Sequence, residues 1–256
     1  MHHQGMGIEW LTELAGAGLD LLLGSQCAAC GAPGVVLCRD CRAQFPDEPI
    51  RRHAPLPGLG PAAPAVWSGA LYRPVAGRLV IAYKDRGAWT LRRQLAELAA
   101  RALLAVAGES GLDPSRMLVV PVPADPRRAR ERGIDHTASL ARAVAGLTGI
   151  RCWPALARGR AAPDQIGLGA GQRRSAQAGT MVMRGRPRRG APRPGGPVVV
   201  LDDVVTTGAT MAEAVRVLAR AAVEVRGCAA VAQTALQESR VNGKKYRLSA
   251  PAPSRN

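Results

Sequence analysis

Residues 198–210, which read VVVLDDVVTTGAT, constrain this chain more than any other segment. The aliphatic run predicts a buried strand over residues 197–201, and the carboxylates of Asp202 and Asp203 follow it. A turn rich in Thr and Gly then leads into a helix expected to begin near Met211. Adjacent carboxylates accept hydrogen bonds from vicinal hydroxyls, and a Gly-containing turn before a helix N-terminus suits a phosphate group. The segment therefore predicts a sugar-phosphate site, with an ordinary strand–turn–helix as the alternative.

The turn itself supplies the groups that a phosphate needs. Its residues are Thr206, Thr207, Gly208, Ala209 and Thr210. The three hydroxyls are donors, and the glycine lets the backbone approach an anion closely. We expect the threonines and Gly208 to contact the phosphate and the two acids to contact the sugar.

The order of apolar segments predicts an α/β fold with a doubly wound parallel sheet. Helices are expected over residues 88–106, 134–147 and 211–222, and strands over residues 117–122, 197–201 and within 223–232. Aromatic residues make up only 3% of the chain, so the core must consist of Ala, Val and Leu, which suits helices packed on a parallel sheet. Ligands in such folds bind beyond the carboxyl ends of the strands, where the two acids are expected.

Four of the six cysteines form two C-x-x-C pairs separated by seven residues. They are Cys27, Cys30, Cys38 and Cys41. Each pair can form a tight turn that presents two thiolates, and two such turns close a four-sulfur site typical of structural zinc. A redox dithiol is the alternative. Clustered cysteines favour a metal in a reducing cytosol over a disulfide framework. Cys152 and Cys228 are expected to be buried structural thiols.

The chain divides into four predicted segments. Residues 1–50 hold an amphipathic helix and the zinc knuckle, and residues 51–66 are a linker rich in Pro and Gly. Residues 67–237 form the sheet domain, and residues 238–256 form a polar, disordered tail. The helix expected within residues 8–23 is too short and too charged to span a membrane. We expect a cytoplasmic protein with no membrane span.

The formal net charge of +16 rests almost entirely on arginine, with 32 arginines and three lysines. Abundant Arg, Ala, Gly and Pro together fit a coding bias as well as selection for phosphate binding. Residues 184–193, RGRPRRGAPR, are expected to be a solvated loop, with a flexible arm for nucleic-acid phosphates as the alternative.

Segment 198–210 resembles the phosphoribosyl-pyrophosphate (PRPP) motif of the type I phosphoribosyltransferases. The order of features around it is similar to the ComF family of competence-associated proteins over residues 8–236. These features are the four-Cys knuckle, Tyr83-Lys84-Asp85-Arg86-Gly87, Val120-Pro121-Val122-Pro123, Arg127, Arg130, Arg132, Gly133, Arg160, Gln165, Leu168 and Arg173. The PRPP motif alone indicates the phosphoribosyltransferase fold, and the knuckle ahead of it narrows the resemblance to ComF.

The resemblance implies roles for individual residues. Asp202 and Asp203 would be the catalytic pair and would hold the ribose hydroxyls of PRPP, partly through Mg²⁺. Residues 206–210, Ala209 included, would cradle the 5′-phosphate. Lys84 would be a further phosphate ligand, with a surface charge as the alternative, and the turn containing Val122 would be the pyrophosphate loop. The arginines available for the diphosphate are Arg127, Arg130 and Arg132, for which a solvated helix face is the alternative. Residues 160–174 would be a mobile loop that closes over the site.

Two departures from family patterns bear on the acceptor. Thr206 stands where purine-type transferases carry an acid, which disfavours a purine acceptor. Residues 132–136 read RGIDH where ComF sequences commonly read RGFNQ, and we expect His136 to be a polar residue at a helix N-terminus. The first functional hypothesis is a Mg²⁺-dependent phosphoribosyltransferase with an unidentified acceptor. The alternative is a competence or DNA-uptake factor that binds single-stranded DNA or a helicase-like partner and whose PRPP site is sensory or vestigial. The sequence predicts no oligomeric state.

Overall fold

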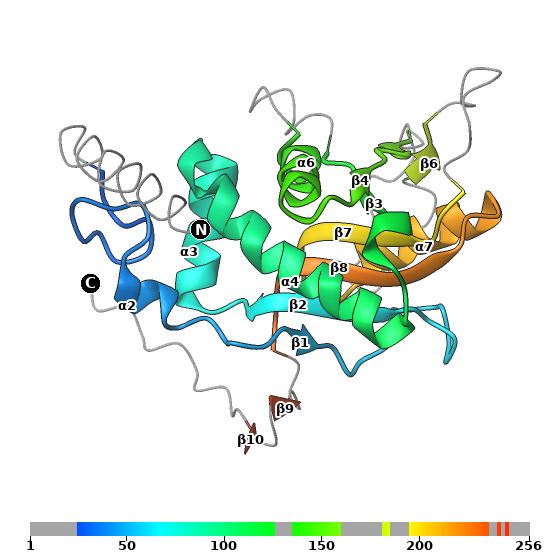
Figure 1. Cartoon of the computed structure of the whole chain (residues 1–256), viewed down its shortest axis with the longest axis horizontal. Helices are drawn as coiled ribbons and strands as arrows, with labels where there is room; N and C mark the ends of the chain where they lie inside the picture. Colours follow the sequence, from blue (N-terminus) through cyan, green and yellow to red (C-terminus); the bar gives the residue numbers. More distant parts are fainter. Residues whose placement is uncertain are drawn as a thin grey trace, which may run out of the picture.

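The computed structural model describes residues 25–125, 135–159, 181–184, 195–235, 240–241 and 244–245. Within these residues a six-stranded sheet has the order β1-β2-β8-β7-β3-β4, and every pairing except β1 with β2 is parallel (Figure 1). Its strands are β1 (Ile50–Arg51), β2 (Ala65–Leu71), β3 (Leu118–Pro121), β4 (Arg151–Cys152), β7 (Val198–Val205) and β8 (Val225–Gln233). The predicted α/β class with a mainly parallel sheet is confirmed.

Helices cover both faces of this sheet, as a doubly wound fold requires. The helical segments are α2 (Arg39–Arg42), α3 (Pro74–Asp85), η1 (Trp89–Leu91), α4 (Arg92–Ser110), η2 (Pro114–Arg116), α6 (His136–Thr148) and α7 (Ala209–Arg220). One hydrophobic core joins α3, α4 and α6 to the sheet, and a second core joins the opposite face to α7. The hairpin of β5 (Leu156–Arg158) and β6 (Met181–Met183) contributes to the second core.

Two glycines allow α4 to lie unusually close to the sheet. A Cβ atom at Gly69 of β2 would lie 2.3 Å from the carbonyl oxygen of Leu98, and one at Gly227 of β8 would lie 2.3 Å from Val106 Cγ1. Because glycine has no side chain, these two positions leave room for α4 to approach the sheet. A core poor in aromatic side chains therefore packs tightly by close approach of main chains rather than by large side chains.

β7 is longer than the sequence predicts. The expected strand ends at residue 201, whereas β7 continues to Val205 and pairs with β8 at Asp202, Val204 and Val205. α7 likewise begins at Ala209, two residues before the expected start. The parallel ladder with β8 keeps the backbone extended here, although aspartates are uncommon within strands. The two acids consequently lie in the last part of the strand itself.

The segment predicted to be a linker over residues 51–66 packs against the sheet domain. Arg51 belongs to β1, and the Arg52 amide donates to the carbonyl of Val66 at 2.8 Å. Leu56 is only 1% exposed and is part of the core beside α7. The segment is packed in place despite its Pro and Gly content, because burial of the apolar side chain of Leu56 is more favourable in free energy than its exposure to water.

Several sequence predictions lie outside the described residues. They are the helix within residues 8–23, the closing loop at residues 160–174 and most of the Arg-rich segment 184–193. In the predicted tail, β9 (Arg240–Val241) and β10 (Lys244–Lys245) form an antiparallel pair. Among the described residues, no helix combines the length and the apolar character that a membrane crossing requires.

The close approach of α4 predicts a large effect of one methyl group. Gly69→Ala should lower the free energy of unfolding by at least about 2 kcal/mol, since the new Cβ meets backbone that cannot move aside. Gly146→Ala, on the exposed side of α6 with nothing within 4 Å of the new Cβ, should instead stabilise by roughly 0.5–1 kcal/mol. Urea unfolding followed by circular dichroism measures both. Equal effects of the two substitutions would contradict the described packing.

Candidate active site and four-cysteine cluster

A cavity of about 430 Å³ opens where β3 and β7 end. It collects residues that are far apart in the sequence, and six of them were predicted to form the site. These are Lys84, Val122, Asp202, Asp203, Thr206 and Thr210. Parallel strands bring their carboxyl ends to the same edge of a sheet, which explains why α3, the turn after β3 and the start of α7 meet there.

The two acids of β7 both line the cavity. Each carboxylate accepts a backbone N–H: the Asp203 amide donates to Asp202 Oδ1 at 2.9 Å, and the Val204 amide donates to Asp203 Oδ1 at 2.6 Å. Lys84 Nζ, from the last turn of α3, lies 2.5 Å from Asp203 Oδ2. The remaining carboxylate oxygens are available to a ligand, although Lys84 must share one of them.

The electrostatics of the acid pair favour a bound cation or a hydrogen-bond donor. Burial, followed by the negative charge of Asp203, raises the pKa of Asp202 to about 8, although Lys84 acts in the opposite direction. Two carboxylates in one partly desolvated site disfavour the doubly ionised state. Carboxylate oxygens are ligands that Mg²⁺ prefers, so the residues present fit a magnesium ion bound together with substrate phosphates.

The turn between β7 and α7 is held from both sides. Gly208 has a φ of 82°, in the left-handed region, and its missing side chain makes room for Leu56 Cδ2, which would lie 2.8 Å from a Cβ. On the other side, the Thr234 amide donates to the carbonyl of Val205 at 3.0 Å. The Thr207 hydroxyl accepts from the Ala209 amide at 3.3 Å, while Thr206 and Thr210 line the cavity. The turn is thus fixed before any ligand arrives.

Arg158 lines the same cavity and was not singled out from the sequence. Its Nε donates to the carbonyl of Pro123 at 3.2 Å, so it links β5 to the turn after β3. Nothing local distinguishes this residue among 32 arginines, and only the fold brings it to the site. The predicted diphosphate ligands Arg127 and Arg132, with Arg130, lie outside the described residues.

His136 also lines the cavity and is 5% exposed. It is the first residue of α6, as expected, and the preceding Asp135 caps the helix by accepting from the Ala138 amide at 2.9 Å. The imidazole stacks on Trp89 with ring centroids 5.1 Å apart and meets the edge of Tyr83 at 5.2 Å. These rings hold His136 as part of the cavity wall, a role that its place in the sequence does not indicate.

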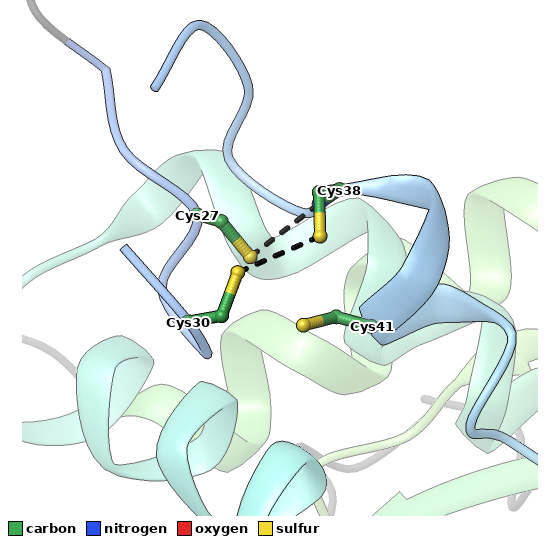
Figure 2. Close-up of side chains that lie close together, drawn as sticks. All are labelled: Cys27, Cys30, Cys38 and Cys41. Atoms are coloured by element: carbon green, nitrogen blue, oxygen red, sulfur yellow. Dashed lines mark hydrogen bonds between the residues drawn. The ribbon is translucent and has the colours of Figure 1, made fainter. Parts of the chain in front are cut away.

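The four predicted metal-ligating cysteines come together in a second site. Figure 2 shows their sulfur atoms directed toward one shared space, and the ligand atoms all lie within 4.8 Å of one another. Cys30 Sγ and Cys38 Sγ are 3.6 Å apart. Zinc–sulfur bonds of about 2.3 Å in a tetrahedron place sulfurs about 3.8 Å apart, so the spacing fits zinc.

Backbone amides around the cluster favour thiolates, which are the form that binds metal. Burial by itself raises the pKa of Cys27, but N–H groups that include that of Cys38 lower it to about 6. The Cys38 amide lies 3.4 Å from Cys27 Sγ. Burial and then the neighbouring sulfurs raise the pKa of Cys41, as expected when several thiolates share a site without a cation. The donor set therefore fits a divalent metal such as zinc.

The cluster predicts about one tightly bound zinc ion per chain. Cys27→Ser combined with Cys41→Ser should abolish zinc binding, because two of four ligands are lost. Cys152→Ser should retain the zinc, because this half-buried thiol lies outside the cluster. Elemental analysis of the purified proteins gives the stoichiometry. Equal zinc contents in the two variants would contradict the assignment.

One comparison with known proteins found a family, and it matches part of the chain. Residues 169–253 match the family model of the phosphoribosyl transferase domain. No curated protein matches the chain. A solved structure described as the allosteric regulatory enzyme of purine biosynthesis aligns at 22% identity, with a TM-score of 0.32, over 55% of this chain and 25% of that one. The family match contains β7, the following turn and α7, which contribute Asp202, Asp203, Thr206 and Thr210 to the cavity.

Proposed function

We propose that the cavity binds PRPP together with Mg²⁺ and that the protein transfers the phosphoribosyl group to an acceptor. One observation carries this proposal. The adjacent carboxylates of Asp202 and Asp203 lie in the last part of a buried parallel strand, and Thr206, Thr207 and Thr210 follow in the turn and the first residues of α7. This arrangement lies within the segment that matches the phosphoribosyl transferase domain.

The residues that line the cavity suggest how PRPP would lie. The ribose hydroxyls would donate to the two carboxylates, and the 5′-phosphate would accept from backbone amides and hydroxyls of residues 206–210. The positive end of α7 adds to the attraction of that phosphate. The diphosphate would then point toward the turn after β3, where Arg158 and Lys84 supply positive charge.

Transfer breaks the bond between ribose C1 and the diphosphate oxygen, and the acceptor forms a new bond to C1. Positive charge develops on the sugar and negative charge on the leaving diphosphate. Fixed cations near the diphosphate stabilise that charge without reorganising, which is where Lys84 and Arg158 act in this proposal. Magnesium held by the acids and the substrate phosphates would neutralise part of the same charge.

We further propose that the protein is of ComF type, because a four-cysteine cluster precedes the sheet domain as in that family. Fewer observations indicate which molecule accepts the phosphoribosyl group. Thr206 lines the cavity at the position where purine-type transferases carry an acid, so the proposed acceptor is not a purine base. The stacked rings of His136 and Trp89 form a wall on which another planar group can pack.

Calorimetric titration with PRPP tests the proposed ligand. Wild-type protein in Mg²⁺ is expected to bind PRPP, and chelating Mg²⁺ should weaken binding strongly. Asp202→Asn with Asp203→Asn should lower the affinity at least about 100-fold, since charge-assisted hydrogen bonds contribute roughly 1.5–3 kcal/mol each.

Asp113→Asn is a matched control, because this carboxylate does not line the cavity and, among the described residues, accepts hydrogen bonds from the amide and the hydroxyl of Ser115. It should leave PRPP affinity unchanged. Diphosphate release in the presence of candidate acceptors then tests turnover. The proposal fails if wild-type protein shows no Mg²⁺-dependent binding of PRPP.

A second candidate function, single-stranded DNA binding in competence, draws on one surface feature. Trp89 is 37% exposed, and Arg86 and Arg92 nearby in the sequence are exposed as well. An exposed aromatic ring beside cations suits stacked bases and their phosphates. The net charge of +16 adds a general attraction for polyanions.

Binding of a fluorescently labelled oligothymidylate tests this candidate across a salt series. Trp89→Ala should weaken binding about tenfold or more, because stacking contributes roughly 1–3 kcal/mol per base. Arg92→Gln should instead reduce the salt dependence by about one counterion. Wild-type affinity no higher than that of an unrelated protein with equal arginine content would contradict DNA binding.

A further inference from the structure

Helix α3 contacts both sites of the molecule. Near its middle, Arg78 Nη1 donates to the carbonyl oxygen of Ala29 at 2.5 Å, inside the turn between Cys27 and Cys30. In its last turn, Lys84 Nζ lies 2.5 Å from Asp203 Oδ2 in the cavity. Lys84 lies six positions after Arg78 along the helix, which corresponds to an axial rise of about 9 Å. One short rigid element therefore joins the first C-x-x-C turn to the acid pair.

Packing reinforces this connection. Cys27, Ala29 and Cys41 are buried in the same hydrophobic core as Leu79 and Tyr83 of α3. Tyr83 directly precedes Lys84, and its ring packs against His136 in the cavity wall. A shift of the cysteine turns would therefore displace α3 at Arg78 and through this core, because close-packed interiors transmit displacement.

Arg78 contacts a backbone carbonyl whose position depends on the cysteine turn. The Gly31 amide donates to the carbonyl of Cys27 at 2.8 Å and the Cys27 amide donates to that of Ala32 at 2.7 Å, which closes the turn around Ala29. A metal bound by the flanking thiolates would hold this turn in one conformation. Without the metal, the acceptor of Arg78 loses that restraint.

We propose that Arg78 is a positioning residue that links the four-cysteine site to the PRPP site by fixing where α3 places Lys84. The inference rests on the proposed function and adds a regulatory consequence to it. Metal occupancy at the cysteines raises PRPP affinity, and by thermodynamic reciprocity PRPP raises the affinity of the cysteines for the metal by the same factor. In this proposal the metal both stabilises the segment that carries the cysteines and raises the affinity of the cavity for PRPP.

A double-mutant cycle with Lys84 tests the proposed route. Arg78→Gln should weaken PRPP binding about five- to tenfold, within the range of measured coupling between sites. In a Lys84→Met background the same substitution should have no further effect, because Lys84 is the group that Arg78 positions. Calorimetry measures the four affinities, and zinc analysis verifies that each variant retains its metal.

The amount of zinc released at equilibrium to a competing chromogenic chelator supplies a second readout that does not depend on turnover. Saturating PRPP with Mg²⁺ should raise the zinc affinity of wild-type protein at least about threefold, and so lower this release, and should have no effect on Arg78→Gln. Arg101→Gln is the matched control. Arg101 of α4 also bonds carbonyls of the N-terminal segment, those of Pro46 and Asp47, but its helix supplies no residue to the cavity. This variant should keep both the wild-type affinity and the effect of PRPP.

The outcomes separate the two claims. If wild-type protein binds PRPP but Arg78→Gln weakens binding equally with and without Lys84, the positioning role is overturned. PRPP binding that leaves zinc release unchanged overturns it as well. If wild-type protein binds no PRPP, the proposed function fails, and this inference fails with it.

Discussion

β7 lies between β8 and β3, and its parallel pairing with both neighbours fixes where the polar groups of the cavity lie. The ladder with β8 continues through Asp202 to Val205, so both acids are held by strand geometry instead of a free loop. The turn that follows is confined by Leu56 against Gly208 and by Thr234 against Val205. A ligand would thus meet a site whose backbone is already ordered, which reduces the entropy lost on binding.

The cavity contains both carboxylates and cations. Asp203 forms an ion pair with Lys84, while Arg158 donates a hydrogen bond to the turn after β3. Carboxylates from β7 together with cations from α3 and β5 suit a ligand that carries both hydroxyls and phosphates. The Lys84–Asp203 contact also means that ligand binding must rearrange this pair. Because Lys84 belongs to α3, that rearrangement is connected to the segment that carries the four cysteines.

Sequence patterns predict the fold class, the acid pair, the phosphate turn and the four-cysteine cluster because each depends on residues close together in the chain. They do not predict features created by long-range contacts. The strand limit at Val205 follows from pairing with β8, and the burial of Leu56 follows from contact with the turn at Gly208. Arg158 resembles every other arginine in sequence, and the place of His136 in the cavity wall depends on three rings brought together by folding.

A crystal structure with PRPP and Mg²⁺ would test whether PRPP binds at the carboxyl end of β7, as we propose. We expect the ribose hydroxyls to lie within hydrogen-bonding distance, about 3 Å, of the Asp202 and Asp203 carboxylates. We also expect the 5′-phosphate to lie against the amides of residues 206–210, with Lys84 moved from Asp203 toward the diphosphate. PRPP bound elsewhere, or bound in the cavity with its ribose away from both acids, would contradict this assignment.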